Sequence, residues 1–551
     1  MAGNAEYIPL DNLNSHENSH KIRVGPSRWK TPEFYFYYLV FIVNIPLMFR
    51  CAIKFSSPNN VNYPKYKDLL SDGWIFDRKA DVSDAQTNSF RSFAFILLYV
   101  LISHVTISRI IQALPSSVNV KYRKIYSLIF SIIFLIVLYG TSLIKILLIL
   151  SLNYYIAKHF GKSKMNPILT WILNIAILFL NDYFQGYKFS ALWSGLSFLD
   201  KRSGLMPRWF INYNYCVLRS ISFNLDYYWC LKNKEESKDT ESKIIENNSM
   251  KDYKARVKDS LLEKDYNFFN YLIYLLYVPL YLAGPIITFN DFIYQINHRN
   301  YLPVKKTVLY AIRFVAICLL FEWTIHYMYV NAIIRRRAYE NFSPFDYSML
   351  AYFSLNNVWL KLLIIWRFFR LWALADNIDT VENMNRSMSN NYSMAGFWRA
   401  WHSSYNKWNI RYIYIPLGGN KNPIINNAVV FTFVAIWHDI SLKLLEWSWL
   451  IIIFLIPEIV CTKFIDKRIR HLHSYRFIKS IGASSNIVLM ITANMVGYVI
   501  GLDGAKEILG EIFAPQHILS WLYMFFCIMV TTQVMFEIRE EEKRRGIFKK
   551  Y

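Results

Sequence analysis

The stretch FWRAWHSSYNKWNIRYIYIPLGGN at residues 397–420, with FVAIWHDI following at residues 433–440, decides the fold. It begins with a helical pattern and then reaches Pro416 and a pair of glycines, through which a helix does not continue. The second piece is an apolar run that ends on His438. Whether this broken backbone lies in water or in a membrane depends on the composition of the whole chain.

The composition is that of a membrane protein. Of the 551 residues, 54% are hydrophobic and 18% are charged, against about 45–50% and about 25% in soluble domains. Apolar runs of about 20 residues, the length that crosses a bilayer, recur along the chain. The expected spans are residues 34–54, 91–113, 123–140, 142–160, 167–183, 268–289, 306–333, 350–374, 424–440, 442–461, 485–501 and 516–536.

The predicted fold is therefore all-α, a polytopic bundle of about 11–13 membrane segments. Two segments, 209–230 and 391–423, mix aromatic and polar residues, and each either crosses or re-enters the membrane.

Polar ends and one polar insert divide the chain. Residues 1–33 form an N-terminal tail, 34–536 the membrane domain and 537–551 a basic C-terminal tail. Residues 231–265 are expected to form a flexible cytoplasmic insert, and residues 350–461 to hold the chemistry.

The net charge of +23 predicts topology rather than nucleic-acid binding. Basic residues fall in short loops, which the positive-inside rule places in the cytoplasm. Both tails are predicted to be cytoplasmic, and His438 then lies near the luminal end of its span. The other basic segments predicted to be cytoplasmic are residues 121–124, 158–164, 231–265, 335–337 and 462–484.

The six cysteines predict neither a disulfide framework nor a nucleophile. None lies between Leu350 and Ile440, and no Cys or His spacing typical of a metal site is present. No metal and no tightly bound cofactor are expected. The sequence also lacks G-x-S-x-G, so direct attack by an acceptor hydroxyl on an acyl thioester is simpler than a covalent acyl-enzyme; acylation of a histidine is the alternative.

A continuous helix over Ala395–Asn409 would have two opposite faces at 100° per residue. Its aromatic face would carry Phe397, Trp401, Tyr405 and Trp408. Its polar face would carry Arg399, His402, Asn406 and Asn409. A helix lying flat at the interface has the same pattern, but the broken backbone that follows favours the wall of a polar cavity, because non-helical backbone survives at membrane depth only there or inside protein.

His402 and His438 are the predicted catalytic residues. Neutral imidazole accepts a proton near physiological pH, and a hydroxyl that attacks a thioester must lose one. The alternative for His438 is a cap at the interface held by Asp439. A second histidine on a polar face favours a shared site, in which Arg399 or Asn406 stabilises the oxyanion. Substrate contacts are predicted for Arg399, Trp401, Asn406, Arg411, Trp437 and Asp439.

The two-histidine signature resembles that of the membrane-bound O-acyltransferase (MBOAT) family. His438 takes the place of the family's catalytic histidine, and His402 a position filled by His, Asn or Asp in different branches. Further blocks are similar to the fungal glycerol-uptake branch, which is related to hedgehog acyltransferase and remodels glycosylphosphatidylinositol (GPI) anchors. These blocks are WKTPEFYFYY at 29–38, LLSDGWIFDRKAD at 69–81, AGPIITFNDFIYQ at 283–295, WLKLLIIWRFFRLWALAD at 359–376 and QVMFEIREEEKRRGI at 533–547.

The resemblance implies a helical bundle around a central tunnel in the endoplasmic reticulum membrane. It implies acyl-CoA as co-substrate and transfer of a long or very long saturated chain to the glycerol hydroxyl of a lyso-GPI-anchored protein or a lysolipid. Membrane lipids are the other expected partners. The sequence leaves open whether the protein also reaches the plasma membrane.

Three alternatives remain at this stage. A glycerol or small-polyol transporter is one, although a broken segment occurs only in the C-terminal half, whereas transporters often break helices in matched halves. A non-catalytic scaffold is the second, and intact His402 and His438 argue against it. The third is a protein acyltransferase of the hedgehog-acyltransferase type.

Overall fold

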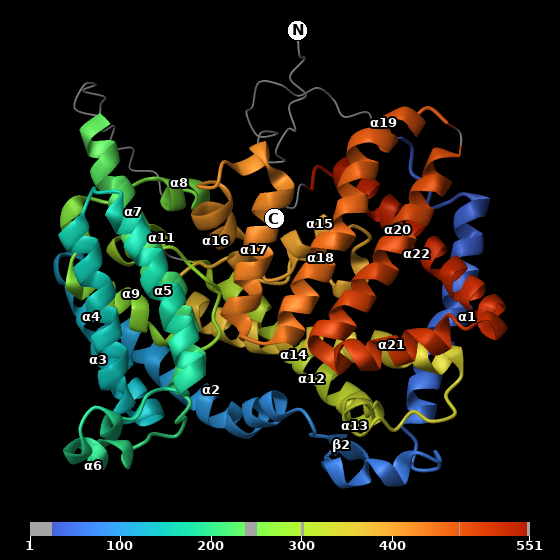
Figure 1. Ribbon diagram of the computed structural model, residues 1–551, viewed down its shortest axis with the longest axis horizontal. Helices are drawn as coiled ribbons and strands as arrows, with labels where there is room; N and C mark the ends of the chain where they lie inside the picture. The colour runs from blue at the N-terminus through green and yellow to red at the C-terminus, as the bar shows by residue number, and fades with distance from the viewer. Residues whose placement is uncertain (1–24, 237–250, 299–301, 473, 548–551) are drawn as a thin grey trace.

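The computed structural model describes residues 25–236, 251–298, 302–472 and 474–547 (Figure 1). Within them the regular structure is helical except for one antiparallel hairpin of β1 (Leu70–Asp72) and β2 (Lys79–Asp81). The N-terminal helices are α1 (Pro32–Phe55), α2 (Ala85–Gln112), α3 (Ser116–Tyr139), α4 (Ser142–Phe160), α5 (Met165–Phe184), α6 (Ser197–Asp200) and α7 (Trp209–Glu236). The predicted all-α class is confirmed.

Shorter helices and long spans alternate in the rest of the chain. The middle helices are α8 (Tyr253–Lys258), α9 (Phe268–Leu276), α10 (Val278–Tyr281), α11 (Phe289–Asn297), α12 (Val304–Tyr327), α13 (Val330–Arg336) and α14 (Pro344–Ala375). The C-terminal helices are α15 (Met394–Ala400), α16 (Ser403–Asn409), α17 (Pro423–His438), α18 (Leu442–Val460), α19 (Asp466–Ile469), α20 (Tyr475–Asn494), α21 (Gly501–Ile512) and α22 (Ile518–Arg544). Three π-helical stretches in the described residues, η9 (Ile410–Tyr414), η11 (Cys461–Ile465) and η12 (Met495–Ile500), follow α16, α18 and α20.

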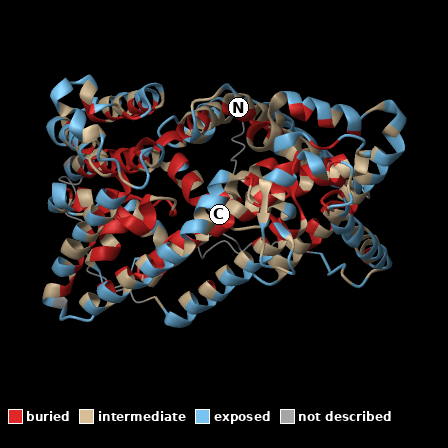
Figure 2. Ribbon diagram, turned by 90° about the horizontal axis from the view of Figure 1, so that it is seen from below, coloured by how far each residue is buried: buried red, intermediate tan, exposed pale blue. Residues whose placement is uncertain are grey.

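The surface of the bundle is apolar and its interior is partly polar, as a lipid environment requires. Nine helices in the described residues are long and apolar enough to cross a membrane. Large side chains such as Ile42 and Phe95 point outward, whereas Asn153 and Asn174 are fully buried. Figure 2 shows the buried residues concentrated in the interior of the bundle. Lipid solvates the apolar faces, and polar groups must find partners inside.

Helix α14 is the central element of the C-terminal half. Eighteen of its 32 residues are buried, and it packs against α1, α12 and α21. Its start is fixed by a capping box, in which Ser343 and Asp346 exchange hydrogen bonds with each other's backbone N–H. A helix thus covers the predicted span 350–374 and begins six residues earlier, but it is not among the helices apolar enough to count as a membrane span.

Both ends of the membrane domain lie on one side, here called the terminal face. The backbone N–H of Arg28 donates to Glu537 Oε1 at 3.0 Å, and Arg544 donates to the carbonyl of Gly25. The predicted placement of the two tails on the same side agrees with these contacts. The cytoplasmic identity of that side stays a prediction. The C-terminal tail continues α22 as far as Arg544 rather than starting at 537.

Residues 335–337 lie on the opposite side, here called the hairpin face because it carries β1 and β2. Asp81 Oδ2 accepts hydrogen bonds from Asn331 N and Ala332 N, at 3.0 Å each. A single membrane-length helix, α1, lies between the N-terminal tail and the hairpin. The prediction that residues 335–337 share the side of the tails was therefore wrong. In Figure 1 the hairpin and α13 lie at the bottom, and α8 and α19 at the top.

The cause of that error is the segment predicted as one span over 268–289. Helix α9 ends at Leu276, α10 is four residues long, and residues 282–288 are not helical. Arg256 Nε lies 2.6 Å from Asp291 Oδ1, so the chain returns to the level at which it entered. The chain therefore makes one crossing fewer than predicted. As a result α12 starts at the terminal face and runs toward the hairpin face.

Part of the insert 231–265 is fixed rather than flexible. Arg256 is buried and pairs with Asp291, and Tyr266 donates to Asn290 Oδ1 at 2.6 Å. The flexible-linker prediction is wrong for residues 253–265. Its middle, residues 237–250, lies outside the described residues. The predicted loop 502–515 is also largely helical, as α21.

Of the two segments predicted either to cross or to re-enter the membrane, one crosses the bundle and the other re-enters. Residues 209–230 form most of α7, which crosses the bundle. Residues 391–423 re-enter from the terminal face: Asn390 O accepts from Arg539 of α22 near the entry, and Lys407 lies over the Tyr253 ring of α8 near the exit. Helix α17 then runs inward to His438, and α18 returns to Glu458, which accepts from Ser393 Oγ at 2.6 Å.

We expect cysteines at 545 and 336 to face opposite compartments. In a Cys461→Ser background, which removes the exposed native thiol, Arg545→Cys and Arg336→Cys are treated with a membrane-impermeant maleimide in sealed vesicles. Arg545→Cys is labelled at once, and Arg336→Cys only after permeabilisation. Labelling of both variants in intact vesicles would contradict the topology.

Candidate functional site

The predicted continuous helix over Ala395–Asn409 is broken at His402. This residue has φ 44° and ψ 48°, in the left-handed region, and it separates α15 from α16. The flanking backbone is held by a neighbouring loop: Ser403 N donates to Asn383 O at 3.0 Å, and Asn385 N donates to Ala400 O at 3.1 Å. These tertiary hydrogen bonds overcome the local helical preference.

The break divides the aromatic face into two parts. Trp401 stacks on Phe397 within α15, with ring centroids 5.4 Å apart. Beyond the break, Tyr405 packs on Trp437 of α17 at 4.5 Å. Helix α16 can therefore face α17 while α15 packs elsewhere, which one straight helix could not do.

His402 lies in an aromatic enclosure with one free ring nitrogen. Its imidazole stacks on Trp366 of α14, with centroids 4.3 Å apart and planes 21° apart. The side chain is buried, and Nε2 has no hydrogen-bond partner among the described residues. A buried nitrogen without a partner costs free energy, about 1–3 kcal/mol. A ligand that pairs with Nε2 would recover that energy.

His438 is the last residue of α17, and its side chain is exposed. Its ring lies 4.8 Å from the Trp437 ring and 6.3 Å from the Tyr405 ring, centroid to centroid. Asp439 makes no hydrogen bond with His438, so the structure gives no support to the alternative in which Asp439 holds His438 as a cap.

The structure brings the two predicted catalytic histidines together around Tyr405 and Trp437. The His402 ring lies 5.2 Å from the Tyr405 ring and 6.3 Å from the Trp437 ring. His438 contacts the same two aromatics. Trp437 thus lies beside both histidines, and its substrate contact stays a prediction. Tyr405 and Trp366 were not predicted there, because an aromatic stripe on a helix is the ordinary pattern of a core face.

Unpaired buried polar atoms gather at the same break. Trp398 Nε1, His402 Nε2 and Ser403 Oγ are buried without a partner among the described residues. In contrast, Ser404 is fully paired: its Oγ donates to Asn383 Oδ1 at 2.6 Å and accepts from Ile286 N at 2.9 Å. Buried polar groups are nearly always hydrogen-bonded, so a polar ligand that reached the break would find unpaired groups to bind.

Arg399, Trp401, Asn406 and Asp439 were also predicted to contact substrate. In the described residues, no ring contact or hydrogen bond joins any of these four side chains to His402 or His438. Trp401 does contact Trp366, the ring on which His402 stacks. The Trp401 and Trp366 rings are 6.1 Å apart. Arg399 and Asn406 are half-buried, and Asp439 is exposed. None of these three side chains has a hydrogen-bond partner in the described part of the chain, so their roles stay predictions.

Arg411 has a structural partner. Its Nη2 lies 2.9 Å from Oδ1 of the fully buried Asp226 on α7, and Tyr412 donates to the same oxygen at 3.0 Å. The guanidinium also covers the Trp229 ring at 5.0 Å. These contacts fasten η9 to α7, and substrate binding by Arg411 stays an untested prediction.

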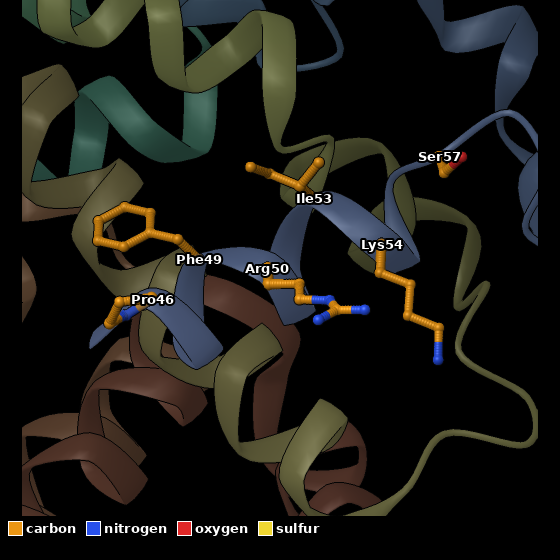
Figure 3. Close-up of a pocket in the computed structure, with 6 residues that line it drawn as sticks. All are labelled: Pro46, Phe49, Arg50, Ile53, Lys54 and Ser57. Atoms are coloured by element: carbon orange, nitrogen blue, oxygen red, sulfur yellow. The ribbon is translucent and has the colours of Figure 1, made fainter. Parts of the chain in front are cut away.

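A surface recess on α1, of about 600 Å³, contains none of the predicted site residues. It is lined by Pro46, Phe49, Arg50, Ile53, Lys54 and Ser57 (Figure 3). Long basic side chains at the end of a membrane helix extend toward the interface in any case. The recess therefore gives no reason to place chemistry there. Among the described residues, no group of three His, Cys, Asp or Glu side chains could hold a metal ion.

Substitutions of His402 should separate its backbone role from its side-chain role. Asparagine and glycine tolerate the left-handed region, whereas alanine does not. If Nε2 acts on the substrate, His402→Ala and His402→Gly both lose roughly 10²–10³-fold in acyl transfer, while His402→Asn, which keeps a polar side chain, loses less. Purified variants are compared by initial rate and by thermal unfolding.

The glycine variant is the deciding control. Glycine adopts the left-handed backbone conformation without strain, so the unfolding temperature of His402→Gly should exceed that of His402→Ala. Wild-type activity in His402→Gly would show that only the backbone turn matters at this position.

The Asp226–Arg411 pair should be structural. Asp226→Leu leaves a half-buried guanidinium without its partner, which costs about 3–5 kcal/mol and lowers the thermal unfolding temperature. Adding Arg411→Met removes the unpaired charge and should restore most of the loss. If Arg411→Met alone raises the KM for the acyl donor without lowering stability, Arg411 binds substrate instead.

Two known membrane-bound O-acyltransferases are similar to this chain over more than nine-tenths of its length. The chain is 46% identical over 534 residues to the membrane-bound O-acyltransferase GUP1 of Saccharomyces cerevisiae, covering 95% of this chain and 94% of the relative. It is 41% identical over 530 residues to gup1 of Schizosaccharomyces pombe, covering 94% and 90%. A more distant match, 25% over 282 residues, is the protein-cysteine N-palmitoyltransferase HHAT of Mus musculus, covering 46% and 55%.

A family-level match encloses the whole site. Residues 133–500 match the family described as MBOAT, membrane-bound O-acyltransferase family, and this range includes α14, the break at His402 and the end of α17. With the two GUP1-type relatives, it establishes that the chain is an acyltransferase and belongs to the membrane-bound O-acyltransferase family.

Proposed function

We propose that this acyltransferase moves a long or very long saturated acyl chain from acyl-CoA to the free glycerol hydroxyl of a lyso-GPI anchor. The observation that carries the chemistry is the meeting of His402 and His438, from separate membrane segments, around Tyr405 and Trp437. The GUP1-type relatives support the acyl transfer. The acceptor rests on the resemblance of this chain to the GPI-remodelling branch.

His438 acts as the general base. Its accessible imidazole takes the proton of the acceptor hydroxyl as that oxygen attacks the thioester carbonyl carbon. The tetrahedral intermediate then expels the CoA thiolate, which recovers the proton from His438. The products are the new ester and free CoA, and no acyl-enzyme forms. General-base help of this kind contributes about 10²–10⁴-fold.

His402 stabilises the developing oxyanion. Its buried Nε2, which has no partner among the described residues, donates a hydrogen bond to the thioester oxygen when the proton is on that nitrogen. The Trp366 stack fixes the direction of the ring. A donor fixed in advance in an apolar enclosure stabilises charge more than a mobile one in water.

The position of His438 suits substrates that arrive from opposite sides. Helix α17 runs inward from the terminal face, so His438 lies away from that face. With a cytoplasmic terminal face, acyl-CoA enters there and the anchor approaches from the lumen, through the predicted central tunnel. The endoplasmic reticulum membrane as its location rests on the resemblance to the GPI-remodelling branch.

Protein acylation is the second candidate, because one relative is named a protein-cysteine N-palmitoyltransferase. That match covers 46% of this chain, whereas the GUP1-type relatives cover more than nine-tenths. No contact in the described residues favours the transporter alternative.

His438→Ala should abolish acyl transfer without loss of the protein. Membranes are incubated with labelled very-long-chain acyl-CoA and a lyso-GPI-anchored protein, and the acylated anchor is measured. The rate should fall roughly 10²–10⁴-fold, because no other group takes the proton of the hydroxyl. His471→Ala, an exposed histidine outside the site, is the matched control and should keep the wild-type rate.

Normal reacylation by folded His438→Ala protein would disprove the assignment. Transfer to a cysteine-containing peptide but not to the lyso-anchor would favour the second candidate. Glycerol flux that disappears with His438→Ala in parallel with acyl transfer would link flux to the enzyme rather than to a separate channel.

A further inference from the structure

The inner end of α17 is held by a residue that lies 223 positions earlier in the chain. Asn214 Nδ2 donates to the carbonyl of Trp437 at 2.7 Å. In return, Trp437 Nε1 donates to the carbonyl of Asn214 at 2.8 Å. Each residue thus gives a side-chain donor to the backbone of the other, which fixes both the distance and the direction between α7 and α17.

This contact acts on the weakest part of a helix. The last four carbonyls of a helix have no partner within it, and helix ends fray unless something caps them. Trp437 O belongs to the last turn of α17, directly before His438. Asp439, the next residue, is already extended, with φ −172°, and its side chain caps nothing. Asn214 therefore pairs with a carbonyl that the backbone of α17 leaves without a partner.

Aromatic contacts complete the clamp. Tyr215, next to Asn214 on α7, packs edge-on against the Trp437 ring at 5.5 Å and 84°. Tyr405 of α16 packs on the same ring at 4.5 Å. The Trp437 side chain is consequently buried, at 4% exposure, while the adjacent His438 is exposed.

We propose that Asn214 is a positioning residue for acyl transfer: by pairing with Trp437, it holds the end of α17 so that His438 faces the reacting hydroxyl. The proposal deepens the function proposed above and rests on His438 as the base. The alternative is that Asn214 only joins two helices, as buried amides in membranes often do.

Steady-state kinetics distinguishes a residue that positions His438 from one that only joins two helices. Misplacing a catalytic group by about 1 Å can cost roughly 10²-fold in rate without changing how the donor binds. Asn214→Leu has nearly the same shape but no donor. We expect its kcat to fall roughly 10- to 100-fold, with the KM for a long-chain saturated acyl-CoA unchanged. Asn214→Gln keeps an amide donor and should recover part of the kcat.

Asn212 provides a matched control on the same helix. Its Nδ2 donates to the Tyr139 hydroxyl at 3.0 Å, away from α17. Asn212→Leu removes an equivalent amide hydrogen bond between helices, so it should lower thermal stability as much as Asn214→Leu does, while kcat stays near wild type. Trp437→Phe, which loses the reciprocal donor but keeps the ring, should lower kcat and combine less than additively with Asn214→Leu.

Three results would overturn the proposal. These are a wild-type kcat in Asn214→Leu, an equal fall in kcat in Asn212→Leu, or a loss that appears only in KM. Measuring His438→Ala in the same preparation keeps the two proposals apart. An active His438→Ala enzyme refutes the proposed base, whereas an inactive one beside a fully active Asn214→Leu enzyme refutes the clamp alone.

Discussion

The left-handed turn at His402 is the constraint on which the rest of the site depends. A non-glycine residue in this region costs roughly 1–2 kcal/mol, and a break in a membrane segment exposes backbone groups that lipid cannot satisfy. The structure offsets both costs locally. The loop at Asn383 takes the free backbone N–H of Ser403, and Trp366 covers the imidazole. His, Asn and Asp are the side chains that tolerate this turn best, and the resemblance allows these three types at the position.

The consequences of the turn extend outward in order. Because α15 and α16 are separate, Tyr405 can reach Trp437, and α17 can end with His438 beside His402. Helix α7 then fixes that end through Asn214. The chemistry is thus built from three segments that enter from the terminal face or cross the bundle, none of which could hold a histidine pair alone. Such preorganisation is what a general base and an oxyanion donor require.

Sequence alone predicted the membrane class, most spans and the histidine pair with Trp437, because these follow from run lengths and from one local motif. It could not predict the turn at His402, since nothing in the local sequence opposes a helix there and distant hydrogen bonds decide the backbone. The role of Asn214 could not be predicted for a related reason: a single asparagine in an aromatic helix forms no periodic pattern that indicates a distant partner. The predicted side of residues 335–337 was wrong because the segment 268–289 was counted as a membrane crossing. It forms short buried helices instead, and apolar composition does not distinguish the two.

The most direct test of the central claim is a cryo-EM structure with a non-reactive thioether analogue of a long-chain acyl-CoA. The account predicts that the analogue's carbon at the thioester position lies between His402 and His438. An acceptor hydroxyl that is hydrogen-bonded to His438 could then attack that carbon. The acyl chain should lie inside the bundle and the CoA moiety toward the terminal face. An analogue bound with its reactive position away from Tyr405 and Trp437 would contradict the account.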